Sequence, residues 1–231
     1  MRPRLLDLFC GAGGAAMGYH RAGFDVVGVD IKPQPRYPFP FIQADALEYV
    51  AAHGHEYDAI HASPPCQAYS PLRCLPWLRD RDYPMLIGPT RSLLESTGRP
   101  WVIENSDRAP LQGIRLCGRM FDLPLYRHRL FESSVFILMP PHVKHDVVIG
   151  HGRMVNDRRN GTLNAGSNKG AWGNQAIVTV AGGQYLKADG ERAMGIDWMT
   201  KYELSQSIPP AYTEFIGTYL LRAVQAAQAA S

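Results

Sequence analysis

The sequence predicts an α/β protein built on a doubly wound, mostly parallel sheet, and three observations support this fold class. Short apolar runs alternate along the chain with segments whose spacing suits helices, which is the pattern of βαβ units. Each run is apolar almost throughout, as is typical of strands covered on both faces. The first run leads into a glycine-rich turn at residues 10–14 and then into a helix-compatible segment.

The individual elements follow from this alternation. Strands are expected at residues 4–9, 25–30, 57–62 and 101–105, and helices at residues 15–22, 44–53 and 85–97. Residues 150–175 are rich in Gly, Asn, Arg and Ser and show little periodicity, which indicates loops. A strand at 176–180 and an amphipathic helix at 214–230 are expected to close the chain.

The composition fits one sizeable domain with a small lobe. The chain has 231 residues, of which 45% are hydrophobic and 19% charged, which excludes wholesale disorder, collagen and coiled coil. We expect a main domain at 1–139 and 194–231 and an irregular basic lobe at 140–193. No apolar stretch approaches about 18 residues and no signal-peptide pattern is present, so we expect a soluble, cytoplasmic protein without a membrane partner.

The four cysteines make a poor disulfide framework for a chain of this length. We expect free thiols, with Cys10, Cys74 and Cys117 packed as small apolar residues. No Cys-x-x-Cys or His-x-x-x-His pair indicates zinc, and we expect no metal site.

Positive charge is concentrated in one part of the sequence. The whole chain carries a formal charge of only +3, but the ten basic and four acidic residues between Arg108 and Gly170 give that window +6. A local basic surface on a nearly neutral molecule favours a polyanion such as nucleic acid as partner. An evenly solvated surface would give the same count.

Ligands of open α/β sheets bind beyond the carboxyl ends of the strands. The glycine turn at 10–14 lies at such an end and, with the helix N-terminus that follows, suits an anionic or zwitterionic ligand. Asp30, about 20 residues further on at the end of the next strand, is placed to accept hydrogen bonds from a ribose diol. Tight packing is the alternative explanation of the glycine turn.

Four further side chains could carry chemistry. Cys66 follows two prolines, which hold its loop rigid and make the thiol a candidate nucleophile or, alternatively, a small buried apolar residue. Glu104 enters an apolar rim, where its pKa should be raised, unless it is a capping or surface acid. Arg127 and Arg129 could share one face of a strand, or be solvated.

Taken together and in order, these motifs resemble the 5-cytosine DNA methyltransferases. The motifs that carry the resemblance are residues 7–14, Asp30, Asp45, residues 64–67, residues 104–105, Arg127-x-Arg129 and residues 207–212. The resemblance spans residues 4–135 and 194–222, and it implies a Rossmann-like class I methyltransferase fold with a short recognition lobe.

The resemblance implies catalytic roles for Cys66, Glu104, Arg129, Arg127 and Asn105. Cys66 would add to carbon-6 of the cytosine ring, and Glu104 would hold ring nitrogen 3 and the exocyclic amine. Arg129 would bind the 2-oxo oxygen, Arg127 would support the loop, and Asn105 would help shape the site.

The implied cofactor is S-adenosylmethionine. The resemblance assigns its binding to Asp7, Phe9, Gly11, Gly13, Gly14, Asp30, Ile31, Asp45, Ala46 and Pro64. Phe9 would form an aromatic wall near the sulfonium, Asp30 would bind the ribose, and Asp45 would accept from the adenine amine.

The implied partner is double-stranded DNA, from which the target base must be flipped. We expect the protein to act as a monomer in a bacterial or phage-infected cell. The compact size fits a phage or restriction-modification setting. One alternative is methylation of cytosine in RNA, although the Cys-Phe-Thr signature of the transfer-RNA branch is missing. The other is an inactive DNA-binding regulator or decoy with this fold.

Overall fold

The computed structural model confirms a doubly wound α/β fold. It describes residues 2–69, 83–142, 145, 149–150, 177–181 and 185–229. Cys74 and most of the lobe expected at 140–193 lie outside the described residues, so the division into two parts remains a prediction. Within the described part of the chain, no helix combines the length and hydropathy needed to cross a membrane.

A seven-stranded sheet with the order β3-β2-β1-β4-β5-β7-β6 forms the centre of the molecule. Its strands are β1 (Arg4–Leu8), β2 (Asp25–Asp30), β3 (Phe41–Gln43), β4 (Ala59–Ala62), β5 (Trp101–Ser106), β6 (Ile114–Leu116) and β7 (Arg129–Ser133). The first five pair in parallel, whereas β7 runs antiparallel to β5 and to β6. The sheet is therefore mostly parallel, as predicted.

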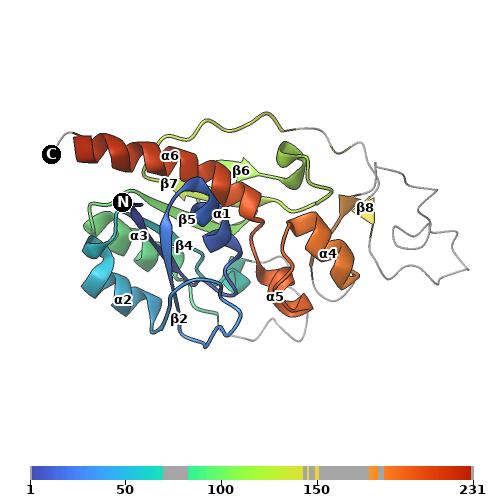
Figure 1. The fold of residues 1–231 in the computed structure, drawn as a ribbon, viewed down its shortest axis with the longest axis horizontal. Helices are drawn as coiled ribbons and strands as arrows, with labels where there is room; N and C mark the ends of the chain where they lie inside the picture. The colour runs from blue at the N-terminus through green and yellow to red at the C-terminus, as the bar shows by residue number, and fades with distance from the viewer. Residues whose placement is uncertain are drawn as a thin grey trace, which may run out of the picture.

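Helices cover both faces of this sheet. They are α1 (Gly14–Ala22), α2 (Ala46–His53), α3 (Ile87–Ser96) and α6 (Pro210–Ala229). In Figure 1, α1 and α6 lie together on one side and α2 and α3 on the other. Neighbouring residues of β1 pack on opposite faces of the sheet. Leu5 lies in the apolar cluster with α1 and α6, and Leu6 lies in the apolar cluster with α2 and α3. This explains why the strands read as apolar throughout.

Several elements were not expected from the sequence. These are β3, β6, α4 (Lys187–Met194) and α5 (Lys201–Gln206), while α6 begins at Pro210 rather than at residue 214. The possible strand with Arg127 and Arg129 on one face is present as β7, but it begins at Arg129, so Arg127 precedes it. The strand expected at 176–180 is reduced to β9 (Ile177–Val178), which pairs with β8 (Ile149–Gly150).

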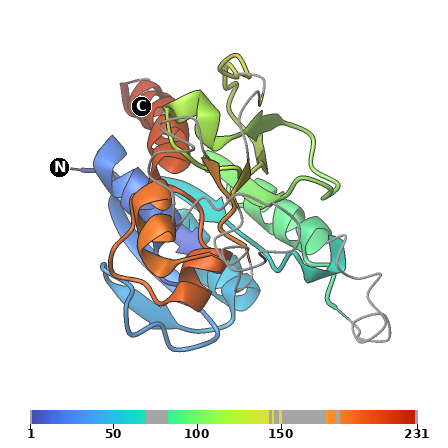
Figure 2. The ribbon, with the colours of Figure 1, turned by 90° about the vertical axis from the view of Figure 1, so that its right-hand side faces the viewer.

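The segment from β9 to α5 packs onto the main sheet domain. Its apolar side chains, such as Val180, Tyr185 and Leu204, form a third cluster with Ala12 and Leu125. Figure 2 shows α4 and α5 beside the end of the sheet. The described end of the expected lobe is therefore joined to the domain that carries the glycine turn.

Candidate active site

One cavity of about 340 Å³ lies at the carboxyl ends of β1, β2, β4 and β5, where ligands bind in this class of fold. It brings together ten of the predicted site residues, namely Asp7, Phe9, Gly11, Gly14, Asp30, Ile31, Pro64, Cys66, Glu104 and Arg129. Residues assigned to the cofactor and residues assigned to chemistry therefore share a single space.

Five predicted residues are not part of the cavity lining: Gly13, Asp45, Ala46, Asn105 and Arg127. Asp45 is the N-cap of α2, where its Oδ1 accepts hydrogen bonds from the backbone N–H groups of Leu47 at 2.9 Å and Glu48 at 3.1 Å. Its assigned contact with adenine remains a prediction. Asn105 and Arg127 act behind the cavity wall, as described below.

The turn after β1 is shaped by left-handed backbone conformations. Gly11 has φ +49°, and Phe9 has φ 56°, a conformation that costs free energy in a residue with a side chain. A Cβ on Gly14 would lie only 1.8 Å from Ser207 Oγ. Ligand binding and tight packing both account for the glycine turn. The turn lines the cavity, and the lack of a side chain at Gly14 lets the segment before α6 pack closely against it.

Asp30 and Ile31 form the next part of the wall. Asp30 accepts hydrogen bonds from the backbone N–H of Gly11 at 3.1 Å and of Lys32 at 2.9 Å, which fixes its carboxylate beside the glycine turn. The side chain of Ile31 is 63% exposed at the cavity. The carboxylate of Asp30 can accept hydrogen bonds from the hydroxyl groups of a ligand, and Ile31 beside it offers an apolar surface suited to a flat ring.

Asp7 presents a buried carboxyl group to the same cavity. Burial raises its pKa to about 8, and the hydroxyl of Tyr37 donates to Oδ2 at 3.3 Å. Asp7 Oδ1 is buried without a hydrogen-bond partner among the described residues. A buried acceptor without a partner is unusual in a folded protein and suits a cationic donor such as the amino group of a bound ligand.

Glu104 and Arg129 form an ion pair at the other end of the cavity, with Oε1 and Nε 2.9 Å apart. Burial raises the pKa of Glu104, while the guanidinium groups of Arg129 and Arg127 and a hydrogen bond with Ser63 oppose the rise. The raised pKa agrees with the expectation for an acid at an apolar rim and argues against a surface acid.

Cys66 lies in the cavity wall near this ion pair. Burial raises the pKa of its thiol, and the positive charge of Arg129 opposes the rise. The side chain of Asn105 holds the loop before Cys66, because its Nδ2 donates to the carbonyl of Pro64 at 2.8 Å. The thiol is thus held in place and is neutral at neutral pH in the protein without substrate.

A buried hydrogen-bonded chain that the sequence did not reveal runs behind Glu104. The hydroxyl of Tyr19 lies 2.9 Å from His61 Nδ1, and His61 Nε2 lies 2.9 Å from Ser63 Oγ. Burial lowers the pKa of His61 to about 3, so the ring is neutral. Since Ser63 in turn bonds Glu104, this chain connects α1 to the carboxylate.

Arg127 is not a solvated charge. Its guanidinium donates to the carbonyls of Val180 and Ser205, the latter at 2.9 Å, and burial lowers its pKa to about 9. It therefore joins the start of β7 to the segment after β9 and to α5. Within the basic window, Arg127 is buried, Arg129 pairs with Glu104, and Arg115 pairs with Asp107 at 2.6 Å. Lys144, Arg153, Arg158, Arg159 and Lys169 lie outside the described residues.

One wall of the cavity was not predicted from the sequence. This wall is formed by residues of α5 and of the segment that follows it, namely Tyr202, Glu203, Gln206, Ser207 and Ile208. Glu203 pairs with Arg36 at 2.8 Å, which ties α5 to the loop after β2. The available signal was Thr200-x-x-Glu203, a capping box that marks the start of α5.

No family model matches the chain. One curated protein with local similarity is the type II methyltransferase M.XorII of Xanthomonas oryzae pv. oryzae, which is 35% identical over 85 residues. The match covers 30% of this chain and 20% of that protein, so it spans about a fifth of the curated relative's length.

Three solved structures match nearly the whole chain in fold. The putative DNA modification methyltransferase from an Escherichia coli prophage gives a TM-score of 0.63 at 16% identity, covering 96% of this chain and 99% of that one. Schizosaccharomyces pombe Dnmt2 gives 0.58 at 14%, and the Entamoeba histolytica methyltransferase EhMeth gives 0.57 at 11%, each covering 97% of this chain and 99% of the other. These three likenesses confirm the Rossmann-like methyltransferase fold that the motifs predicted.

Proposed function

We propose that this chain, which has the fold of the cytosine-5 methyltransferases, methylates carbon-5 of cytosine in double-stranded DNA. One observation carries the proposal. Cys66, Glu104 and Arg129 line the same cavity as the glycine turn, Asp30 and Ile31, so a nucleophile and an acid–arginine pair adjoin a site suited to a nucleoside cofactor. The enzyme would act inside the cell, where its DNA substrate is found.

The residues around the first turn fit S-adenosylmethionine. The unpartnered Oδ1 of Asp7 suits the cofactor's amino group, the carboxylate of Asp30 suits its ribose, and Ile31 offers an apolar surface to its adenine. When bound, the cofactor supplies an electrophilic methyl group. Phe9, held in a left-handed conformation, is the aromatic side chain of this wall.

The side chains at the other end of the cavity would activate the cytosine. Carbon-5 of cytosine is a poor nucleophile, and addition of the Cys66 thiolate to carbon-6 makes it electron-rich. Burial raises the pKa of Glu104 and so favours its protonated form, which would donate a hydrogen bond to ring nitrogen 3 as negative charge develops there. Arg129 would stabilise both the thiolate and the 2-oxo oxygen. Carbon-5 would then take the methyl group, with the demethylated cofactor as the leaving group. Loss of the carbon-5 proton to a base would re-form the ring double bond as the sulfur–carbon bond breaks, which frees the Cys66 thiolate.

DNA is favoured over RNA as the substrate by two lines of support. The similar proteins include a putative DNA modification methyltransferase and a type II methyltransferase. The chain also has no Cys-Phe-Thr segment of the kind found in the transfer-RNA branch. A target carbon inside a duplex is out of reach of Cys66, so the base has to be flipped into the cavity at a cost of a few kcal/mol.

Methyl transfer from radiolabelled S-adenosylmethionine tests the proposal directly. Purified chain is incubated separately with double-stranded DNA and with total RNA, and bisulfite sequencing of a plasmid from expressing cells maps the modified cytosines. Label in DNA that is lost in Cys66→Ala supports the proposal. Label in RNA alone would assign the RNA substrate instead, and no label in either would favour an inactive DNA-binding protein.

A further inference from the structure

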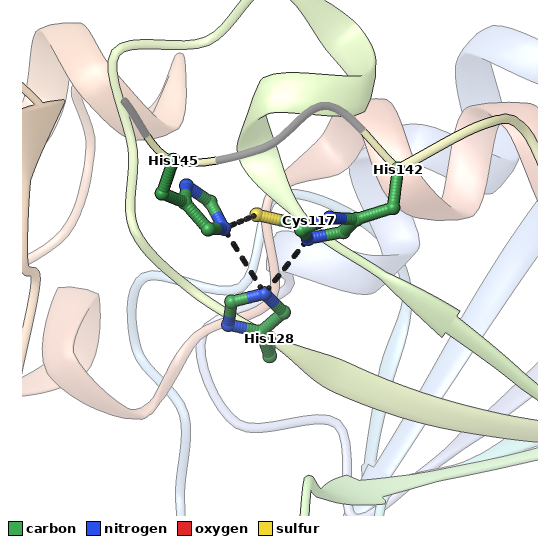
Figure 3. Close-up of side chains that lie close together, drawn as sticks. All are labelled: Cys117, His128, His142 and His145. Atoms are coloured by element: carbon green, nitrogen blue, oxygen red, sulfur yellow. Dashed lines mark hydrogen bonds between the residues drawn. The ribbon is translucent and has the colours of Figure 1, made fainter. Parts of the chain in front are cut away.

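Four side chains that the proposed methyl transfer does not use point toward one another beside the start of β7. Cys117 directly follows β6, His128 directly precedes β7, and His142 and His145 belong to the chain after β7 (Figure 3). One ligand-type atom from each residue lies within 4.8 Å of all the others. We refer to these four residues as the Cys117 cluster.

Three separations within the Cys117 cluster are close to those around a tetrahedral zinc ion. His128 Nε2 lies 3.1 Å from His142 Nε2 and 3.3 Å from His145 Nε2, and Cys117 Sγ lies 3.5 Å from His145 Nε2. With Zn–N near 2.0–2.1 Å and Zn–S near 2.3 Å, tetrahedral angles place two nitrogens about 3.3 Å apart and a sulfur and a nitrogen about 3.6 Å apart. The three contacts are close to these spacings, and the other three pairs of atoms lie within 4.8 Å of one another.

Hydrogen bonding alone accounts poorly for this arrangement. A ring nitrogen of neutral histidine carries either one proton or one lone pair, so His128 Nε2 cannot make two directed hydrogen bonds, to His142 and to His145. Three Nε2 atoms and a sulfur that face a common point are instead arranged as electron-pair donors to a cation. The dashed contacts in Figure 3 outline this point.

The surroundings hold the cluster in place. Cys117 is fully buried before a 3₁₀ turn at Gly118–Phe121, and backbone groups of Gly118, Arg119 and Arg127 hydrogen-bond its thiol. The ring of Tyr126 packs edge-on against His128 and His145, with centroids 5.0 Å and 4.9 Å away. Such outer contacts orient the ligands of protein metal sites.

We propose that Cys117, His128, His142 and His145 bind one Zn²⁺ ion at a structural site. A borderline-soft thiolate and imidazole set with tetrahedral spacing suits zinc, and four protein ligands leave no open position for chemistry. The ion would fasten His142 and His145 to the β6–β7 edge of the sheet. Because His128 stands between Arg127 and Arg129, it would also steady the chain that leads into β7.

Metal analysis of the full chain without an affinity tag tests the site. Wild type is first loaded with zinc during gel filtration and is then freed of unbound metal by a second gel filtration. It is expected to retain one zinc ion per chain, measured by inductively coupled plasma mass spectrometry. His142→Ala is the informative variant because His142 is exposed and its loss should leave the fold intact. It should lose its zinc, whereas His55→Ala, a matched exposed histidine, should keep it.

Cobalt substitution and a chelator provide readouts that are independent of methyl transfer. The Co²⁺ form should show the visible bands of tetrahedral cobalt and a thiolate charge-transfer band, which Cys117→Ser loses and Cys66→Ala keeps. A strong chelator should lower the thermal midpoint of wild type but not that of His142→Ala. Wild type without stoichiometric zinc, another metal retained in its place, or zinc retained by both His142→Ala and Cys117→Ser would overturn the proposal.

Discussion

Glu104 and Arg129 lie on two antiparallel neighbours, β5 and β7, and their side chains form an ion pair of 2.9 Å across the ladder. In the proposed mechanism both groups contact the same cytosine, Glu104 at its nitrogen 3 edge and Arg129 at its 2-oxo oxygen. The pairing means that each side chain sets the charge and the position of the other before a base arrives. Loss of either partner leaves a buried group uncompensated.

Arg129→Ala is therefore expected to reduce kcat/KM for DNA by about 10²- to 10³-fold, the range seen when one preorganised donor is removed from an active site. Steady-state methyl transfer measures this change. Arg222→Ala, on the exposed side of α6, is the control and should behave as wild type. If Arg129→Ala retained wild-type kcat/KM, Arg129 would have no part in the chemistry.

The pH dependence of methyl transfer should reflect the thiol. Because burial raises the pKa of Cys66 above its ordinary value, the fraction of thiolate is small at pH 7 and grows as pH rises. We expect kcat/KM measured in the same salt to rise from pH 6 to pH 9 and to fall away at acid pH. A profile that stays flat down to pH 5 would argue against a thiolate nucleophile.

Asp7 should make the stability of the cofactor-free protein depend on pH. Its folded pKa of about 8 lies above the ordinary value of 3.8, so its protonated form favours folding, and this contribution is complete below about pH 4 and is lost as pH rises through 8. The free energy of unfolding should fall by up to about 1.4 kcal/mol per pH unit in that window. Thermal melts from pH 5 to pH 9 should show this slope in wild type and in the exposed control Asp25→Asn, but not in Asp7→Asn. Equal slopes in all three proteins would exclude the assignment.

Asn105 is expected to act through the position of Cys66. Removing its amide leaves the Pro64 carbonyl without the 2.8 Å hydrogen bond and loosens the loop that carries the thiol. Asn105→Ala should lower kcat by about tenfold to a hundredfold, the cost of a small misplacement, with little change in KM. Gln112→Ala is an exposed control. A change in KM without a change in kcat would place Asn105 in substrate binding instead.

The parts of the fold that the sequence predicted are those in which the pattern is local. The apolar runs of β1, β2, β4 and β5 and the turn after β1 could be read directly, because parallel strands buried on both faces have few other interpretations. The β6 and β7 strands are short and carry polar residues such as Arg115 and Arg129, and their pairing with β5 depends on contacts distant in sequence.

The same distinction holds for the site. Cys66 follows a strand and Glu104 lies near the end of one, so both could be placed at one edge of the sheet, and the cavity contains both. The wall from α5, the chain from Tyr19 through His61 to Ser63, and the carbonyl partners of Arg127 join residues far apart in sequence. Cys117 was expected only to pack, because its histidine neighbours come from three later positions of the chain. The His142-x-x-His145 spacing was the one local signal of that cluster.

Covalent trapping tests the central claim most directly. Double-stranded DNA in which 5-fluorocytosine replaces cytosine blocks the final elimination, because fluorine at carbon-5 cannot leave as a proton does. With S-adenosylmethionine present, wild type should form a DNA adduct that survives denaturing electrophoresis, and Cys66→Ala should form none. Absence of an adduct with wild type on DNA that it methylates, or equal adduct with Cys66→Ala, would contradict attack by Cys66.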